Sequence, residues 1–209
     1  MIQQLKTGTT TVGIVCKNGI VLAADMRATA GTMIVDKKAE KIQILSDDFA
    51  VTWAGTVSDA QLMTRLAKAE LKLKEVRTGK SPSTKEAANL LAGMQYAGIR
   101  RPSMLMAIAH FLLGGRDSSG VHLYDLFPDG SVTKIKDYVS SGSGSVFAYG
   151  VMETQYDANM TVDQGVQMAI KAVNTALQRD SASGNGINVV VVTVEGIKRV
   201  MTKELVATL

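Results

Sequence analysis

A threonine near the start of the chain has the neighbours that self-activating chemistry needs. Residues 7–13 read Thr-Gly-Thr-Thr-Thr-Val-Gly, and a cut after Gly8 would make Thr9 a new N-terminus. A terminal threonine carries a hydroxyl nucleophile and a free α-amine, and the amine can act as base for the hydroxyl, directly or through a water. Glycine suits the position before the cut, because a side chain would obstruct the tight turn that self-cleavage requires. We therefore hypothesise that residues 1–8 are a propeptide and that residues 9–209 form one hydrolase domain.

The sequence has few of the histidine and cysteine residues that metal centres and histidine-based triads require. His110 and His122 are the only histidines, and they lack metal-ligand spacing with Cys16, the only cysteine. A single cysteine makes an internal disulfide impossible and favours a reducing compartment. We expect no metal, no cofactor and a cytoplasmic location.

Composition argues against two further classes of partner. Of the 209 residues, 46% are apolar and 20% charged, which is ordinary for a globular protein, and the net charge is only +4. Basic and acidic residues are interleaved, so no nucleic-acid footprint is indicated. The N-terminus is too short and polar for a signal peptide, and the longest apolar run, residues 104–113, is about half a membrane span. We expect no nucleic acid and no membrane as partners.

The first third of the chain predicts β-hairpins followed by helices. Residues 9–17 are rich in β-branched side chains, and Asn18-Gly19 is a strong hairpin signal before a return strand at 20–24. A loop is expected at 25–31, then a second pair of strands. The second strands are expected at 41–45 and 49–54.

Two helices follow in the sequence pattern. Thr56 or Ser58 can cap a helix that runs to about Arg77, and Ser83 with Glu86 forms a capping box for the next one. The apolar residues that recur at steps of three and four predict the buried faces. For the first helix these are Leu62, Leu66, Ala69, Leu73 and Val76, and for the second Ala87, Leu90, Leu91 and Met94.

The rest of the chain alternates again between strands and helices. Thr161 with Gln164 is a further capping box, and it begins the clearest amphipathic helix of the chain, ending near Arg179. Strands are expected at 104–113, 121–127, 131–136, 187–194 and 199–202, with a turn at 114–120, a glycine-serine loop at 140–145 and a helix at 146–156.

This element order favours an α+β fold. Two antiparallel sheets stacked on each other, with helix pairs on both outer faces, would satisfy it as a four-layer α-β-β-α sandwich. The pattern alone fits a generic α+β domain nearly as well.

Six short motifs occur in an order that makes the sequence specific. They are Gly8-Thr9-Thr10-Thr11-Val12-Gly13, Asp25 sixteen residues after Thr9, Lys41 sixteen residues after Asp25, Ala54-Gly55, the Gly142–Ser145 loop and the Arg179–Gly184 turn. Together they resemble the β-type subunit of the 20S proteasome, most closely the archaeal form, an N-terminal-nucleophile hydrolase. The resemblance covers essentially all of residues 9–205 and implies the four-layer fold.

The resemblance implies a role for each matching residue. Thr9 matches the nucleophile, Gly8 the residue before the processing site, and Gly55 the glycine whose N–H forms the oxyanion hole. Lys41 matches a cation that lowers the pKa of the terminal amine, and Asp25 the acid that orients it. Ser143, Asp180 and Ser183 match polar groups around the amine. Taken singly, each residue also has a plain structural interpretation, such as a strand threonine, a surface lysine or a loop aspartate.

A substrate-binding set follows from the same resemblance. Thr29 matches a residue whose backbone binds an extended peptide, so that main-chain hydrogen bonds give affinity without reading sequence. Trp53 falls where the family lines the pocket for the side chain before the cut, and it is unusually bulky for that place. It could shrink or close the pocket, or it could be a core tryptophan. The other expected pocket residues are Ala28, Ala39, Gln43 and Val57.

The expected function is a threonine-type endopeptidase subunit that degrades unfolded proteins after autocatalytic removal of residues 1–8. The resemblance implies heptameric β rings stacked between α rings, with a regulatory ATPase acting through the α ring. A catalytically silent or unprocessed structural β subunit of the same ring is the first alternative. A self-activating amidase that acts on a small molecule is the second, because fold does not fix function.

Overall fold

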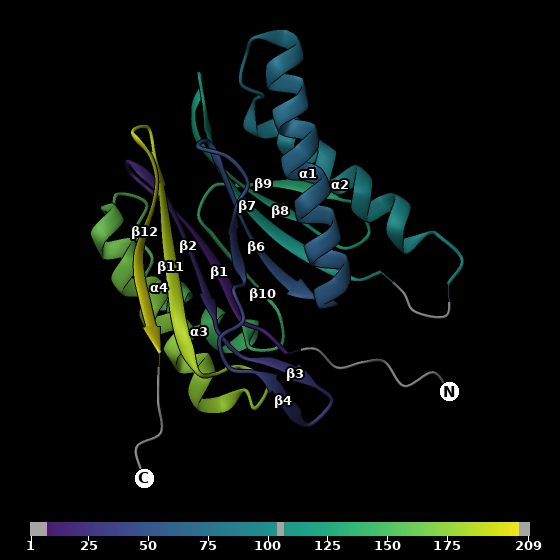
Figure 1. Cartoon of the computed structure of the whole chain (residues 1–209). Helices are drawn as coiled ribbons and strands as arrows, with labels where there is room; N and C mark the ends of the chain where they lie inside the picture. Colours follow the sequence, from purple (N-terminus) through teal and green to yellow (C-terminus); the bar gives the residue numbers. More distant parts are fainter. Residues whose placement is uncertain (1–7, 104–106, 205–209) are drawn as a thin grey trace.

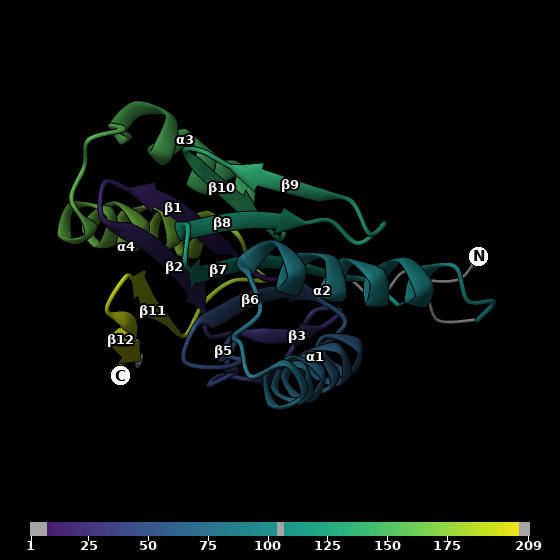
Figure 2. The ribbon, with the colours of Figure 1, turned by 90° about the horizontal axis from the view of Figure 1, so that it is seen from above.

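The chain folds into four layers, two β-sheets stacked face to face between two pairs of helices. A computed structural model describes residues 8–103 and 107–204. Seen from above, helices α3 and α4 cover the outer face of one sheet, and α1 and α2 cover the outer face of the other (Figure 2). The α+β sandwich expected from the sequence is therefore confirmed.

The first sheet has the strand order β10-β1-β2-β11-β12, and every neighbouring pair is antiparallel. The hairpin predicted at Asn18-Gly19 joins β1 to β2, with Cys16 opposite Gly19. Strand β11 lies in the interior of this sheet, which explains its continuous apolar run. The bounds are β1 Thr11–Cys16, β2 Gly19–Asp25, β10 Tyr138–Ser141, β11 Gly186–Thr193 and β12 Gly196–Glu204.

The second sheet runs in sequence order, β5-β6-β7-β8-β9, and is also antiparallel. A separate two-stranded ribbon, β3-β4, projects from the end of the sandwich where the chain begins (Figure 1). The bounds are β3 Ala28–Ala30, β4 Met33–Asp36, β5 Ile42–Ile44, β6 Phe49–Gly55, β7 Ala109–Asp117, β8 Gly120–Leu126 and β9 Val132–Ile135.

The helix ends follow the capping signals in the sequence. Ser83 and Glu86 form the predicted capping box of α2, and Thr161 and Gln164 form that of α4. Helix α1 ends at Gly79, whose φ of 65° is the left-handed conformation that favours glycine. The bounds are α1 Val57–Thr78, α2 Thr84–Ile99, α3 Ser145–Gln155 and α4 Val162–Arg179.

Three apolar clusters fill the spaces between the four layers. One joins the second sheet to α1 and α2 around Phe49 and Phe111, and another joins the first sheet to α3 and α4 around Ile14 and Val173. The third fills the space between the sheets around Leu22 and other aliphatic side chains of both. The site must therefore lie at an end of the sandwich, where strand termini are not covered.

Several sequence predictions were wrong in their details. Residues 28–30 form β3 instead of a loop, β7 continues through Gly114–Asp117 with the turn at 118–119, and β10 occupies the start of the expected glycine-serine loop. Strand pairing explains all three, because β3 pairs with β4, β7 with β6 and β8, and β10 with β1. Part of the strand expected at 104–113 lies outside the described residues.

The predicted buried face of α1 was also wrong. Leu62, Leu66 and Val76 are 49%, 47% and 71% exposed, and the remaining members of the predicted face are exposed too. The face against the sheet is instead made of Ala60, Met63, Thr64, Ala67 and Leu71. Helix α1 is apolar on two sides, so periodicity alone could not tell which side is buried.

Candidate active site

The predicted nucleophile lies just before β1, at the open end of the sandwich. Thr9 is 2% exposed, and its hydroxyl donates a hydrogen bond to the carbonyl oxygen of Gly8, 2.5 Å away. A Cβ on Gly8 would come within 1.7 Å of the Ala182 side chain. No residue larger than glycine fits at position 8 in this conformation. The sequence argument for glycine before the cut therefore has a structural counterpart.

A buried ion pair lies beside the Gly8–Thr9 peptide bond. Lys41 is fully buried, and its Nζ donates to Asp25 Oδ1 at 2.7 Å and to the Gly8 carbonyl oxygen at 3.5 Å. The sequence pattern taken alone had left Lys41 as a surface lysine, but the chain turns it inward just before β5 begins. The structure therefore brings Lys41, Asp25, Gly8 and Thr9 together.

Backbone groups hold the Asp25 carboxylate in place. Its Oδ1 also accepts from the Thr10 N–H at 2.9 Å, and its Oδ2 accepts from the N–H groups of Arg27 and Gly184 at 3.0 and 2.9 Å. These donors come from three segments, the start of β1, the β2–β3 connection and the α4–β11 turn. Asp25 thus links the segments that carry the other site residues.

Burial sets the ionisation of Lys41. Desolvation lowers the pKa of its ammonium below the ordinary lysine value, while the Asp25 carboxylate opposes that shift. A lowered pKa makes Lys41 release its proton more readily than a surface lysine. Lys41 is therefore placed to polarise the adjacent Gly8 carbonyl.

The three polar residues expected around the terminal amine form one hydrogen-bonded group. Asp180 Oδ2 accepts from the hydroxyls of Ser143 and Ser183, each at 2.6 Å. The backbone N–H of Thr9 donates to Ser143 Oγ at 3.3 Å. Ser143 therefore contacts the nitrogen that would become the free amine after cleavage, and Asp180 and Ser183 are connected to it through Ser143.

Gly55 occupies the end of β6 with a φ of 118°, where an L side chain would be strained. A Cβ there would meet the Ile108 carbonyl oxygen at 2.3 Å. The Trp53 N–H donates to the Lys41 carbonyl on one edge of β6, and the Thr56 N–H donates to Ile108 on the other. Strand alternation therefore places the Gly55 N–H on the edge that carries Lys41.

The expected substrate-binding residues are Thr29, which contacts Gly8, and a set of pocket residues around Trp53. Thr29, in β3, accepts a hydrogen bond from the Gly8 N–H through its hydroxyl at 3.2 Å, so it already binds the segment before the cut. Ala28 and Ala39 are buried, Gln43 is half-buried, and Val57 begins α1 with 36% exposure. Gln43 and the indole N–H of Trp53 both donate to the Glu40 carbonyl, at 3.0 and 3.2 Å.

Trp53 is packed into the cluster beneath α1 and α2. It is 5% exposed and shares that cluster with Met63 of α1. The structure thus places Trp53 as a buried tryptophan whose backbone is bonded to Lys41. Its effect on a substrate pocket stays a prediction.

Two groups at the site were missed by the sequence analysis. Thr10 was read as an ordinary strand threonine, yet its hydroxyl lies 2.7 Å from Ser183 Oγ and extends the Asp180 group. Gly142 has a φ of 92°, and a Cβ on it would come within 2.0 Å of the Thr9 carbonyl oxygen. The glycine pair flanking Ser143 was the available signal for this close approach.

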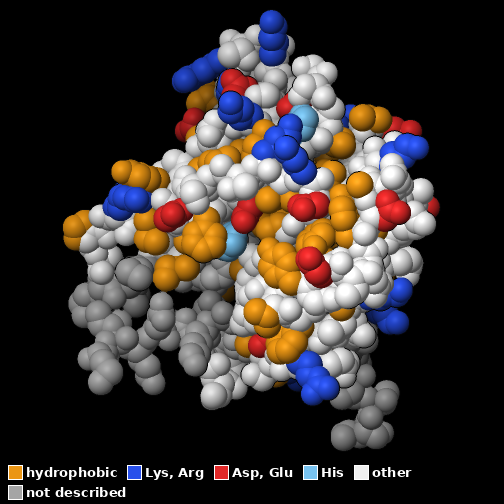
Figure 3. All heavy atoms as spheres, turned by 180° about the vertical axis from the view of Figure 1, so that it is seen from behind, with side chains coloured by type: hydrophobic (Ala, Val, Ile, Leu, Met, Phe, Trp, Pro, Cys, Tyr) orange, Lys and Arg blue, Asp and Glu red, His pale blue; other side chains and the backbone are white. Residues whose placement is uncertain are grey.

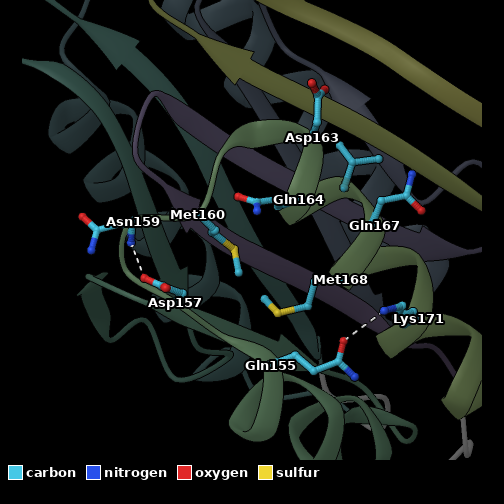
Figure 4. Close-up of a pocket in the computed structure, with 10 residues that line it drawn as sticks. Gln155, Asp157, Asn159, Met160, Asp163, Gln164, Gln167, Met168 and Lys171 are labelled. Atoms are coloured by element: carbon cyan, nitrogen blue, oxygen red, sulfur yellow. Dashed lines mark hydrogen bonds between the residues drawn. The ribbon is translucent and has the colours of Figure 1, made fainter.

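Other features of the described chain lie away from this site. A pocket of about 690 Å³ between α3 and α4, lined by Gln155, Asp157, Lys171 and neighbours, contains none of the predicted site residues (Figure 4). Within 8–103 and 107–204, no three metal-ligating side chains gather in a way that could hold an ion, and no helix could span a bilayer. On the face shown in Figure 3, basic and acidic side chains are interspersed.

Comparison with known proteins shows the family to which the chain belongs. The family model described as proteasome subunit matches residues 5–192. A proteasome subunit beta of Ferroglobus placidus is 40% identical over 202 residues, which are 97% of this chain and 94% of the relative. The corresponding protein of Methanocorpusculum labreanum is 42% identical over 193 residues, 92% of this chain and 89% of the relative. That of Methanocaldococcus vulcanius is 40% identical over 199 residues, with coverages of 95% and 87%.

Two stacked antiparallel sheets between helix pairs, with a threonine at the start of the first strand, define the class of N-terminal-nucleophile hydrolase folds. Within that class, the chain belongs to the proteasome subunit family, and the three relatives named above are archaeal β subunits.

Proposed function

We propose that this chain is a threonine endopeptidase that becomes active when it removes its own residues 1–8. The observation that carries the proposal is the meeting of four groups at one peptide bond. Thr9 Oγ1 lies 2.5 Å and Lys41 Nζ 3.5 Å from the Gly8 carbonyl oxygen, and Asp25 binds Lys41. A strand threonine without a role in catalysis has no need of a buried lysine beside the preceding carbonyl.

Self-cleavage would use these groups in sequence. The Thr9 hydroxyl attacks the Gly8 carbonyl carbon and gives up its proton as the C–O bond forms, while the Lys41 ammonium, 3.5 Å from the carbonyl oxygen, stabilises the charge that develops there. The bond between the Gly8 carbonyl carbon and the Thr9 nitrogen then breaks, the nitrogen takes up a proton, and the acyl group remains as an ester on the Thr9 oxygen. Water hydrolyses this ester and releases residues 1–8 as a carboxylic acid. The Gly55 N–H supports the proposal as a donor for the oxyanion, because it lies on the edge of β6 that faces Lys41.

Cleavage frees the Thr9 amine, which completes the catalytic group. The amine replaces the peptide nitrogen that now contacts Ser143, so it lies within the Ser143–Asp180–Ser183 cluster. It takes the proton of the Thr9 hydroxyl as the hydroxyl attacks a substrate carbonyl, and the cation at Lys41 keeps its pKa low enough for that task. Hydrolysis of the acyl-enzyme ester returns the free threonine.

The proposed substrates are unfolded polypeptides bound in extended form. The Thr29 hydroxyl accepts a hydrogen bond from the Gly8 N–H, so the residue just before the cut is held at β3. A substrate chain in the same position would add its backbone to this ribbon, which gives affinity without dependence on sequence.

Assembly with α subunits and further β subunits is proposed from the family. The exposed apolar face of α1, which includes Leu62 and Leu66, supports it, because such side chains gain from burial against another subunit. Stacked heptameric rings, a regulatory ATPase acting on the α ring and a cytoplasmic location remain predictions.

Hydrolysis of a fluorogenic peptide and of an unfolded protein by the assembled, processed complex tests the proposal. We expect Thr9→Ala to abolish both activities, Thr9→Ser to retain part of them, and Thr11→Val, a strand neighbour, to leave them unchanged. Activity that survives Thr9→Ala would refute the proposal. An assembled wild-type complex that cleaves neither substrate would favour the silent structural subunit instead.

A further inference from the structure

A buried glutamine on α2 holds the strand end on which Gly55 rests. Gln95 is 1% exposed, and its Nε2 donates to the carbonyl oxygens of Ala109 in β7 and Leu126 in β8, at 2.7 and 2.8 Å. Its Oε1 is buried without a hydrogen-bond partner among the described residues. A buried amide with one unsatisfied atom is costly in an otherwise apolar layer. The two donated bonds therefore need a reason.

The register of β7 and β8 supplies that reason. Phe111 faces Leu126, so two residues further along the ladder Ala109 would face Pro128. Because the Thr56 N–H donates to Ile108, strand alternation points the Ala109 carbonyl toward β8. Proline has no N–H to donate, so the ladder cannot continue there. The Gln95 amide takes the place of the missing backbone donor.

The end of β7 that Gln95 holds packs directly against the backbone of Gly55. Ala109 is the register partner of Gly55, and the preceding carbonyl, that of Ile108, accepts from Thr56 and lies where a Gly55 Cβ would be. A shift of Ala109 would therefore move Ile108 and, with it, the Gly55–Thr56 peptide and the Gly55 Cα, and so would change the orientation of the adjoining Gly55 N–H.

Other contacts fix the helix that carries Gln95. The Arg100 guanidinium lies 3.6 Å from the centroid of the Tyr96 ring and donates to the Asp129 carbonyl at 3.0 Å. A Cβ on Gly130 would come within 2.7 Å of Tyr96. The C-terminal end of α2 is thus attached to the connection between β8 and β9, which contains Pro128.

We propose that Gln95 is a positioning residue for the oxyanion hole: by bonding Ala109 in place of Pro128, it fixes the end of β7 that sets the orientation of the Gly55 N–H. Gln95 does not touch the substrate and acts through Ala109 and Ile108. This inference rests on the proposed peptidase function and identifies a residue that the sequence motifs do not contain.

The test compares the processed, assembled wild-type protein with Gln95→Met, which keeps the volume and loses both donors. We expect kcat for a peptide substrate to fall about ten- to a hundredfold, less than the roughly hundred- to thousandfold fall for outright loss of an oxyanion donor, with KM changed less than about threefold. A peptide aldehyde, which adds the Thr9 hydroxyl across its C=O to form a hemiacetal, should lose affinity by a similar factor. The matching peptide alcohol cannot form the adduct and should bind as before.

Two further variants separate positioning from stability. Leu91→Ala removes a buried side chain one turn earlier on α2, and we expect it to lower thermal stability without the selective loss of aldehyde affinity. Adding Pro128→Ala to Gln95→Met restores a backbone N–H opposite Ala109 and should recover part of kcat. The inference is overturned if Gln95→Met keeps wild-type kcat, if it weakens aldehyde and alcohol equally, or if Pro128→Ala recovers nothing. Retention of wild-type activity by Thr9→Ala would instead refute the peptidase function itself.

Discussion

At the scale of single residues, the site depends on one buried charge pair. Lys41 and Asp25 have side-chain exposures of 1% and 0%, and each would carry a large desolvation cost alone. Three backbone N–H groups from three segments complete the shell of Asp25. The pair therefore has two roles. It stabilises the fold by ordering the loops that meet at Thr9, and it polarises the Gly8 carbonyl.

Removing the cation should harm folding and processing together. In Lys41→Met the Asp25 carboxylate stays buried without its counter-charge, so we expect the free energy of unfolding to fall by about 3 kcal/mol. Self-cleavage after Gly8 should stop. Chemical denaturation and intact mass measure the two effects. Lys38→Met, at a lysine whose side chain is 68% exposed, is the control and should change stability by less than about 0.5 kcal/mol. Processing of Lys41→Met at the wild-type rate would contradict the role given to this lysine.

Trp53 should restrict the side chain accepted before the cut. Its side chain packs in the cluster beneath α1 and its backbone N–H is bonded to the Lys41 carbonyl, so a smaller residue would open space in the layer next to the segment that carries Lys41. We expect Trp53→Ala to raise cleavage after large hydrophobic residues relative to small ones, and to cost about 3–5 kcal/mol of stability. Peptide libraries that differ only at that position measure the preference. Destabilisation with unchanged preference would leave Trp53 as a core residue only.

At the scale of elements, local signals predicted the helices better than the strands. The capping boxes at Ser83 and Thr161 are formed as the sequence indicated, because both partners of each box lie within four residues. Strand β10 was missed, since it exists through its pairing with β1 and carries serines that resemble a loop. The extent of a strand depends on partners distant in sequence, which a single pattern does not contain.

Site residues show the same division. The ordered motifs identified Thr9, Asp25, Lys41 and the Asp180 turn, and the structure brings all of them together. Thr10 and Gln95 could not be found this way. Thr10 stands in the first motif but acts through a contact with Ser183, far along the chain. Gln95 belongs to no motif and acts through Ala109 and Leu126.

The α2 capping box should make stability depend on pH. Hydrogen bonds from Lys74 and Ser83 lower the pKa of Glu86 to about 2 from 4.5. A lowered pKa in the folded state stabilises the protein above pH 4.5, and that contribution is lost as the pH falls through about 2. Glu86→Gln keeps the box and removes the charge, so we expect it to cost about 0.5 kcal/mol at pH 7, since the pair is exposed.

The pH series identifies the cause. Denaturant unfolding at neutral and progressively lower pH should show the difference between wild type and Glu86→Gln shrinking below pH 4.5. Glu195→Gln, on an exposed turn, serves as the control. A difference that stays constant down to about pH 2 would show that charge at Glu86 does not contribute.

At the scale of the whole molecule, the four layers leave catalysis at one end and an apolar helix face outside. Helix α1 buries mainly small residues against the sheet and exposes Leu62, Leu66, Leu73 and Val76. A monomer gains nothing from this arrangement, whereas an assembled subunit can bury the exposed face. The sequence analysis predicted this apolar face of α1 to be buried in the subunit. Its exposure in the structure is consistent with burial against another subunit.

Substitution on that face should separate assembly from folding. We expect Leu66→Asn to change the free energy of unfolding by less than about 0.5 kcal/mol and to reduce assembly with partner subunits. Leu71→Ala, at a buried position of the same helix, should cost about 3 kcal/mol. Native mass spectrometry of mixtures with α subunits measures assembly. Normal assembly of Leu66→Asn would exclude this part of the α1 face from the subunit contact.

The central claim is that Thr9 becomes the N-terminus by its own chemistry. Intact mass with N-terminal sequencing, before and after the chain is mixed with its ring partners, tests this most directly. The account predicts loss of residues 1–8 and a new terminus at Thr9 in the wild type, and an uncut chain in Thr9→Ala assembled in the same way. A wild-type chain that still carries Met1 after full assembly, or a Thr9→Ala chain cut at the same bond with no active subunit present, would contradict it.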